Sequence, residues 1–220
     1  MAIRLQFAAV QLMIAALLAG FSLSAPAADW SPRSRQQALD ETRSSQMNKR
    51  RLGYARLAEV GTLEDVPLVL AALWDEEELI RGMAEQVVWG IWMRADDPVV
   101  DPMFQTGVRL LVENEPAAAL EKLNEVIAMR PEFAEAWNRR GDAFVALGDY
   151  ERALANYSHT IELNPYQFGT LESCGQIWLE RSEYRKAADY FRRALELNPN
   201  QPALALALIE LEEKLENDRI

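Results

Sequence analysis

The 220-residue sequence contains a single cysteine, Cys174, and a single histidine, His159. One cysteine excludes an intramolecular disulfide, so the fold has to be stabilised by packing alone. One cysteine and one histidine also fall short of the ligand set that a zinc site requires. We expect Cys174 to be a small apolar side chain buried in a helix, and His159 to lie on the solvent-facing side of its helix.

Sequence signatures of catalysis are missing as well. The chain has no P-loop, no dinucleotide-binding fingerprint and no G-x-S-x-G elbow. The carboxylates Asp96, Asp97 and Asp101 cluster around Pro98, where they would either cap the following helix or bind calcium. We favour capping, and therefore expect no cofactor, no metal and no enzymatic activity. A carboxylate-based, metal-dependent enzyme or factor remains the alternative.

Three tryptophans in the first half of the chain raise a second question about ligands. Trp74, Trp89 and Trp92 are of the type that forms an aromatic cage around a cationic ligand. Buried packing of neighbouring helices is the interpretation that we favour for them.

Positive charge is scarce over most of the chain. Residues 57–220 hold 15 basic and 31 acidic side chains, a net charge of −16. Residues 28–56 hold 7 basic and 3 acidic side chains, a net charge of +4. Because phosphate binding needs a basic surface, the acidic body argues against a nucleic-acid partner.

The sequence also lacks an apolar run long enough to cross a bilayer. The longest run, residues 7–20, is interrupted only by Gln11 and is shorter than the roughly 20 residues that a spanning helix needs. Arg4 precedes it and Ala25-Pro26-Ala27 follows as an A-x-A cleavage site. We therefore predict a signal peptide over residues 1–27, and an exported protein, of the bacterial periplasm, with no transmembrane helix after cleavage.

Four classes of residue recur every 34 positions in the second half of the chain. The small residues are Gly107, Gly141 and Gly175, and Ala119, Ala153 and Ala187. The large apolar and terminating residues are Leu123, Tyr157 and Phe191, and Pro131, Pro165 and Pro199. Four independent classes that share one period indicate internal repeats, each made of two helices.

The repeated glycine has a physical explanation in this pattern. Gly141 lies inside the predicted helix of "AWNRRGDAF", where a glycine costs about 1 kcal/mol relative to alanine. Gly141 and Ala153 would provide the space for the paired helices to approach, so that Tyr157 and Trp137 pack over the contact. Gly148, and Asn114 in the preceding unit, are expected in the left-handed turn between the helices.

These residues resemble the tetratricopeptide repeat family, whose pattern is W-x₂-L-G-x₂-Y, A-x₃-F and P. The second unit matches it with Trp137, Gly141, Phe144, Ala153, Tyr157 and Pro165. The leucine of the pattern is replaced in every unit, by Thr106, Arg140 and Cys174. The resemblance covers residues 98–199 and implies an all-α fold, a right-handed α-solenoid of about three helix pairs.

The resemblance also implies a concave groove that binds a peptide or partner protein, lined by the first helix of each pair. The matching positions are Phe104, Val108, Leu111, Asn138, Asp142, Val145, Glu172, Gln176 and Leu179. Some family members bind a C-terminal carboxylate through lysine and asparagine at the positions of Phe104 and Val108, and those donors are absent here. An apolar anchor followed by basic or polar groups fits better. An open alternative is that lead-in helices cover Phe104 and Val108.

The remaining segments are predicted as helical ends of the array. Residues 28–47 read as a polar tether or loosely held helix, and residues 48–95 as a helical lead-in that resembles a HEAT-type unit. Residues 200–220 form a final helix whose leucine stripe is Leu204, Leu208, Leu211 and Leu215. We expect this stripe to cap the array, and self-association into a homo-oligomer is the alternative.

Overall fold

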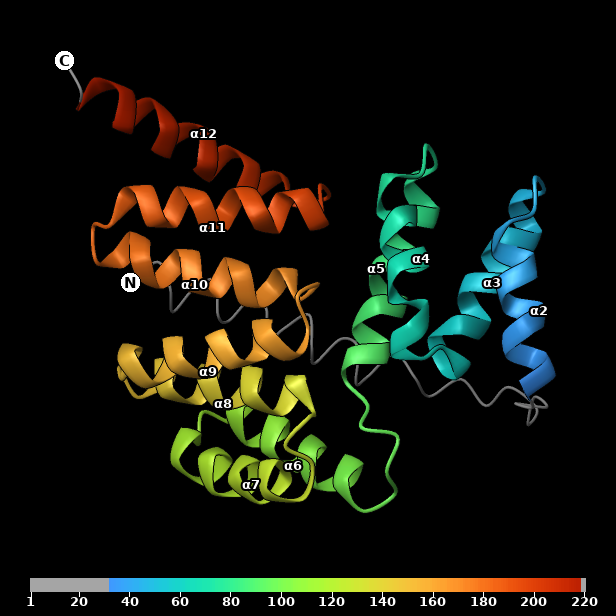
Figure 1. Ribbon diagram of the computed structural model, residues 1–220, viewed down its shortest axis with the longest axis horizontal. Coiled ribbons are helices and arrows are strands. Elements are labelled where there is room, and N and C mark those ends of the chain that lie inside the picture. The colour runs from blue at the N-terminus through green and yellow to red at the C-terminus, as the bar shows by residue number, and fades with distance from the viewer. Residues whose placement is uncertain (1–31, 219–220) are drawn as a thin grey trace. The chain divides into compact units, whose positions relative to one another are not determined.

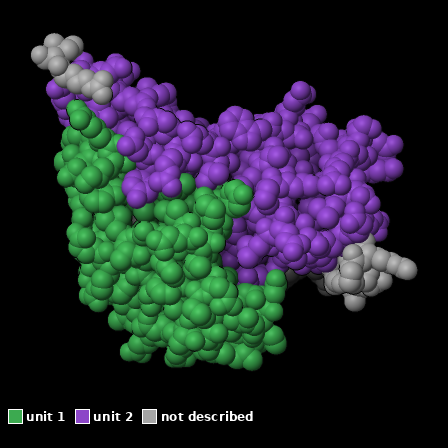
Figure 2. All heavy atoms as spheres, in the orientation of Figure 1, with its two compact units in different colours: residues 1–27, 95–187 green, residues 28–94, 188–220 purple. Residues whose placement is uncertain are grey.

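A computed structural model describes residues 32–218 of the chain. Every regular element in that range is a helix, which confirms the predicted all-α fold. The described residues fall into two compact units: unit 1 comprises residues 95–187, and unit 2 comprises residues 32–94 and 188–218 (Figure 2). The predicted signal peptide, residues 1–27, lies outside the described residues.

Unit 1 is built from helices joined by short turns (Figure 1). They are α6 (Val100–Val112), α7 (Pro116–Met129), α8 (Ala134–Ala146), α9 (Tyr150–Leu163) and α10 (Phe168–Glu180). Helix α11 (Tyr184–Leu197) begins in unit 1 and continues in unit 2. The alternation of helix and turn confirms the α-solenoid of helix pairs that the 34-residue period predicts.

The turn within each pair contains one residue in the left-handed region. Asn114 has a φ of 60°, and Gly148 has a φ of 79°. Both therefore adopt the conformation predicted for them. Ser182, with a φ of 59°, occupies the equivalent turn before α11 and was not predicted. Its turn still closes, because its amide donates to the carbonyl of Leu179 at 2.9 Å.

The repeated glycines lie where neighbouring helices touch. A Cβ atom placed on Gly141 would come within 2.7 Å of Cδ1 of Tyr157, and one on Gly107 would lie 3.0 Å from Cδ2 of Leu123. Both distances are shorter than an ordinary van der Waals contact. Ala119 and Ala153 beside these crossings are fully buried. Packing therefore explains why these helices contain glycine.

Unit 2 contains the lead-in helices and the end of the chain. Its helices are α2 (Pro32–Thr42), α3 (Met47–Val60), α4 (Val66–Ala71), α5 (Glu78–Trp92) and α12 (Pro202–Asn217), with short 3₁₀ turns over Leu63–Asp65 and Ala72–Trp74. The predicted capping pair is present, since the amide of Thr62 donates to Asp65 at 2.9 Å. Pro67 lies in the first turn of α4, as predicted. The HEAT-type resemblance of this segment stays a prediction.

Of the two alternatives for residues 28–47, a polar tether or a loosely held helix, the structure has a helix over residues 32–42. These residues form α2, which packs so closely on α3 that a Cβ atom on Gly53 would lie 2.8 Å from the carbonyl oxygen of Ala38. Arg35 pairs with Asp65 at 2.8 Å, and Arg56 pairs with Glu41 at 2.7 Å. Ion pairs and a close backbone contact hold this polar helix, which has few apolar side chains of its own.

Helix α12 turns its leucine stripe inward. Leu204 and Leu211 are 3% and 5% exposed, while Leu208 and Leu215 are partly exposed. Arg192 of α11 pairs with Glu212 of α12 at 2.7 Å, which joins the two helices within unit 2. This arrangement supports the capping interpretation of the stripe.

Candidate binding surfaces

The first predicted lining residues of the groove belong to the core of unit 1. Phe104 and Val108 are 0% and 1% exposed, and Leu111 is also buried. The ring of Phe104 meets the ring of Phe133 edge to face, with 4.8 Å between their centroids. These three side chains of α6 therefore contribute hydrophobic packing to the structure, and a partner does not reach them as they lie.

Helix α8 carries three charged side chains along one of its faces. The guanidinium of Arg139 lies 2.5 Å from Glu135 and 2.9 Å from Asp142, which are respectively one turn before and one turn after it. The side chains of Glu135 and Arg139 are almost fully buried, and that of Asp142 is 12% exposed. We call Glu135, Arg139 and Asp142 the α8 triad. Only Asp142 was predicted to line the groove, although the Glu-x₃-Arg-x₂-Asp spacing was readable in the sequence.

Neutral polar side chains complete the hydrogen bonding of the triad. The hydroxyl of Tyr157 donates to Asp142 at 2.8 Å, and the amide of Asn138 donates to Glu135 at 3.1 Å. From the next pair, Thr170 donates to Asn138 at 2.8 Å and Gln167 donates to Glu135. The predicted residue Asn138 is thus buried inside a network that joins α8, α9 and α10.

Burial dominates the electrostatics of the triad. It raises the pKa of both the Glu135 and the Asp142 carboxyl, because the charged form loses its hydration. The pKa of Tyr157 lies well above its usual value, through burial and then through the negative charge of Asp142. Two carboxylates share one guanidinium, so the ionised triad has an excess of one negative charge.

Helix α10 carries a further carboxylate among the predicted groove positions. Glu172 is partly exposed, burial raises the pKa of its carboxyl, and it forms no ion pair within residues 32–218. Gln176 is buried at 8% exposure, Leu179 is partly exposed, and Val145 of α8 is buried. We define the acidic inner face as Asp142, Glu172 and Leu179, the predicted groove positions that solvent still reaches, backed by Glu135 and Arg139.

The Asp96–Asp101 cluster behaves as a helix cap. One oxygen of Asp97 accepts from the amides of Val99 and Val100 at 2.9 and 3.1 Å, and the other lies 2.6 Å from Arg130. The hydrogen bond from Arg130 lowers the pKa of Asp97 to about 2, and the two amides act in the same direction. Asp101 accepts from the amide of Ala95 at 2.6 Å. Asp97 therefore caps α6 as predicted, whereas Asp101 bonds an amide that precedes the helix and so holds the segment before it.

The lone cysteine, the lone histidine and two of the three tryptophans of the lead-in pack against other side chains or are buried. Cys174 is buried at 1% exposure, as expected. His159 is partly exposed and packs against the ring of Trp137 at 4.2 Å. Trp89 and Trp92 are buried with their rings edge to face at 5.4 Å, whereas Trp74 is 64% exposed. Buried packing therefore accounts for two of the three tryptophans.

Within residues 32–218, no three of the histidine, cysteine and acidic side chains come together in a way that would bind a metal ion. In the same range, none of the helices combines the length and apolar character that crossing a membrane requires.

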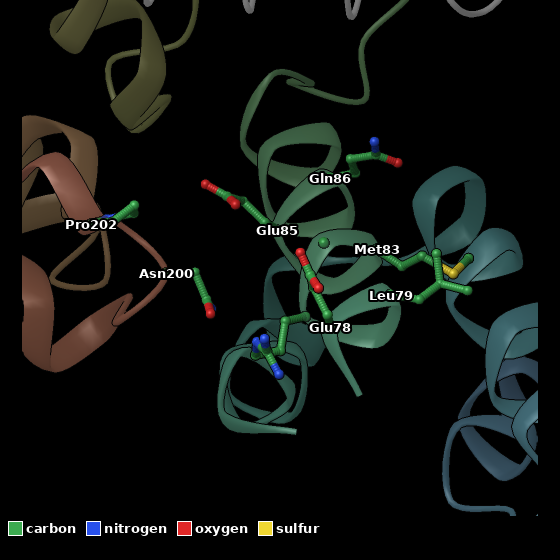
Figure 3. A pocket seen from close by; sticks show the side chains of 9 residues that line it. Glu78, Leu79, Met83, Glu85, Gln86, Asn200 and Pro202 are labelled. Atoms are coloured by element: carbon green, nitrogen blue, oxygen red, sulfur yellow. The ribbon is translucent and has the colours of Figure 1, made fainter. Parts of the chain in front are cut away.

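A second surface, on α5 of unit 2, is hollowed (Figure 3). The hollow has a volume of about 790 Å³ and is lined by Gly82 and its neighbours in α5, together with Asn200 and Pro202. Asn198 donates to Glu85 at 3.1 Å, and Asn200 donates to the carbonyl of Leu73 at 2.7 Å. These two bonds fix the wall of the hollow to the lead-in helices. No feature of the sequence alone indicated this hollow.

Comparison with known proteins gives the class of this chain. Models of the tetratricopeptide repeat match residues 104–167 and residues 178–201. A TPR repeat-containing protein of Rhizobium etli is 26% identical over 128 residues, which are 58% of this chain and 63% of that protein. The photosystem I assembly protein Ycf3 of Prochlorococcus marinus is 33% identical over 49% of this chain and 58% of its own length. The chain thus spans less than two thirds of the length of both relatives.

Among solved structures, the crystal structure of MamA aligns with 69% of this chain and 88% of its own, at 18% identity and a TM-score of 0.44. The two matched segments and the helix pairs of unit 1 agree with the 34-residue period of the sequence. The matched segments of this chain, residues 104–167 and 178–201, are tetratricopeptide repeats.

Proposed function

We propose that this chain is a non-catalytic scaffold of the cell envelope that binds a basic segment of a partner protein on the acidic inner face. Tetratricopeptide repeats generally mediate protein–protein interactions, through the extended surfaces that stacked helix pairs create.

The charge imbalance of the acidic inner face carries this proposal. Glu135, Asp142 and Glu172 supply three carboxylates, and Arg139 supplies the one guanidinium that pairs with two of them. Anions of low exposure are unfavourable unless a cation compensates them. A lysine or arginine of a partner would lie between Asp142 and Glu172, and its methylene groups would lie near Leu179.

The location in the cell envelope rests on the N-terminal sequence alone. Arg4, the apolar run of residues 7–20 and the Ala25-Pro26-Ala27 site support export of the chain. Fractionation of cells that express the full chain or a chain lacking residues 2–27 tests it. We expect the full chain in the periplasmic fraction and the shortened chain in the cytoplasm, and equal distribution would contradict export.

Binding is tested with a variant that removes charge without changing shape. Asp142→Asn with Glu172→Gln neutralises the acidic inner face, and Glu121→Gln with Glu196→Gln neutralises two exposed carboxylates elsewhere. We expect quantitative pull-downs from envelope extracts to lose a defined partner with the first variant only. Recovery of every partner by both variants would contradict binding at the acidic inner face.

The salt dependence of the same interaction provides a second readout. Salt screens the attraction between partly exposed charges: the screening length is about 10 Å at 0.1 M salt and becomes shorter as the salt concentration rises. The captured partner should therefore be released at high salt. Release from the control variant should follow the wild-type curve. A partner that stays bound in high salt would be held by apolar contacts, which contradicts the proposed basic segment.

A further inference from the structure

The glycines inside the helices of this chain differ in what surrounds them. Gly53, Gly107 and Gly141 each lie against a neighbouring helix, and an added Cβ atom would meet that neighbour within about 3 Å. Gly82, in the second turn of α5, has no atom within 4 Å of the position of such a Cβ. A glycine at an interior helical position costs about 1 kcal/mol relative to alanine. Packing inside the chain repays this cost at the first three positions and not at Gly82.

The acidic and the apolar side chains that line the hollow over Gly82 both come from α5 (Figure 3). Glu85 extends toward Asn200 and Pro202, Glu78 lies in front of the helix, and Leu79 and Met83 lie on the side away from Asn200. Leu79 is 50% exposed. Gly82 forms the floor between the two sides because it has no side chain.

The charges of the hollow favour a cationic occupant. Glu78 is exposed and forms no ion pair within the described residues, and Glu85 is held in place by the amide of Asn198 at 3.1 Å. Arg81 also lines the hollow, but its guanidinium donates to the backbone carbonyls of Asp75 and Glu76 at 2.9 and 3.1 Å. The carbonyls of the turn before α5 thus hold this cation, and two carboxylates remain beside Gly82.

We propose that the Gly82 hollow binds an aliphatic and basic segment of a partner protein, with a lysine or arginine laid across Gly82. The charged end of that side chain lies at Glu78 and Glu85, and a neighbouring aliphatic side chain covers Leu79 and Met83. Glycine is required because the stem of the bound side chain passes close to the helix backbone. This site lies in unit 2 and is independent of the acidic inner face in unit 1.

The test uses a substitution that fills the hollow while favouring the helix. Gly82→Leu places a side chain in open space and improves helix propensity, so the variant should melt at or above the wild-type temperature. The matched control is Ala155→Leu, which adds a similar side chain at an exposed position of α9. The probe is a short fluorescein-labelled peptide of alternating lysine and leucine, measured by fluorescence anisotropy with the full chain lacking residues 1–27.

We expect Gly82→Leu to weaken binding of the peptide about tenfold or more, the effect of losing roughly one well-formed contact, and Ala155→Leu to bind like the wild type. Binding by Gly82→Leu within twofold of the wild type would overturn the proposal, as would a wild-type chain that does not bind. If Gly82 affected only stability, Gly82→Leu would change the melting temperature and leave peptide binding unchanged, which would also overturn the proposal.

A charge-removing pair provides the second arm. Glu78→Gln with Glu85→Gln should weaken binding, and the exposed pair Glu213→Gln with Glu216→Gln on α12 should not. Equal weakening by the two pairs would show that the peptide responds to the net charge of the chain, and would also overturn the proposal. Because the same basic peptide would also fit the acidic inner face, every comparison is repeated in the Asp142→Asn with Glu172→Gln background. Loss of binding on Gly82→Leu in that background reports the Gly82 hollow alone, so the failure of one proposed site is distinguishable from failure of the other.

Discussion

The first two repeats use the same packing positions and turn different side chains to their inner faces. In α6 that face is apolar, and Phe104 and Val108 are buried. In α8 the corresponding positions are Asn138 and Asp142, which belong to a buried polar network. The helix crossing is conserved in kind, since Gly107 meets Leu123 and Gly141 meets Tyr157. Packing positions define the repeat, and the inner face is free to vary in chemistry.

This difference makes the two repeats unequally sensitive to substitution. An apolar inner face loses only packing when it is changed, while a charged and buried one also leaves unpaired groups behind. Four substitutions, ordered from the largest expected effect to the smallest, test whether the contrast between the repeats is real.

Arg139→Leu should have the largest effect on the free energy of unfolding. Removing the guanidinium leaves the buried carboxylates of Glu135 and Asp142 without their cation, which costs about 3 kcal/mol. The equivalent residue of the first repeat is Gln105, and Gln105→Leu should cost less than about 1 kcal/mol. Urea denaturation at neutral pH measures both values. Similar losses at the two positions would end the contrast.

The same variant has a defined pH dependence. Burial raises the folded-state pKa of Glu135 and Asp142, and unfolded carboxyls titrate near pH 4. The stability that these carboxyls contribute is therefore fully present below that pH and is lost as the pH rises through the raised folded-state pKa. We expect the deficit of Arg139→Leu to narrow on acidification from neutral pH. A constant deficit would contradict unpaired carboxylates as its cause.

Gly141→Ala should have the second largest effect. The new Cβ atom would overlap the ring of Tyr157, whose hydroxyl is held by Asp142, so about 2 kcal/mol of stability should be lost. At Gly107→Ala the new atom meets Cγ and Cδ2 of Leu123 at 3.0 Å, a looser contact than the one at Tyr157, and the gain of about 1 kcal/mol in helix propensity offsets the strain. Denaturation midpoints compare the two. Equal losses would show that the aromatic ring is not what makes the second crossing rigid.

The helix pairs could be predicted because their signal is local and recurs. Gly141, Ala153 and Pro165 each indicate a small side chain or a restricted backbone at one position. The same residue types recur 34 residues earlier and 34 residues later. The α8 triad was equally local, at i, i+4 and i+7 on one helix. It could have been found by asking where Arg139 would pair.

The partners from other helices could not be predicted. Gln167 and Thr170 reach the network from the next helix pair, so their role depends on how the pairs stack. The packing of α2 could not be predicted for the same reason: Arg35 pairs with Asp65, which lies 30 residues further along the chain. The hollow over Gly82 combines α5 with residues 198–202, which no periodicity connects.

Tyr157→Phe sharpens the contrast at the level of one hydrogen bond. The hydroxyl donates to Asp142 at 2.8 Å, and its removal leaves a buried acceptor with one donor fewer, at a cost of about 1.5 kcal/mol. Leu123 of the first repeat has no such group. Tyr166→Phe is the control, because Tyr166 is exposed, and it should change stability by less than about 0.5 kcal/mol. Thermal unfolding separates the two variants, and equal melting temperatures would contradict a stabilising bond.

Asp97→Asn should have the smallest effect, and it concerns the first repeat alone. Asp97 pairs with Arg130 at 2.6 Å and caps the start of α6, whereas the residue 34 positions later is Pro131, which has no carboxylate. The hydrogen bond from Arg130 lowers the pKa of Asp97 from 3.8 to about 2, so its contribution to stability is present above pH 3.8 and lost as the pH falls toward about 2. Urea denaturation over that range should show the wild type slightly more stable at the upper end and equal to the variant at the lower end.

The exposed control Glu121→Gln should follow the wild-type curve, because the difference belongs to the Arg130 contact rather than to the loss of any one negative charge. If the gap between Asp97→Asn and the wild type persists at the acidic end, the cap holds the first repeat through shape alone.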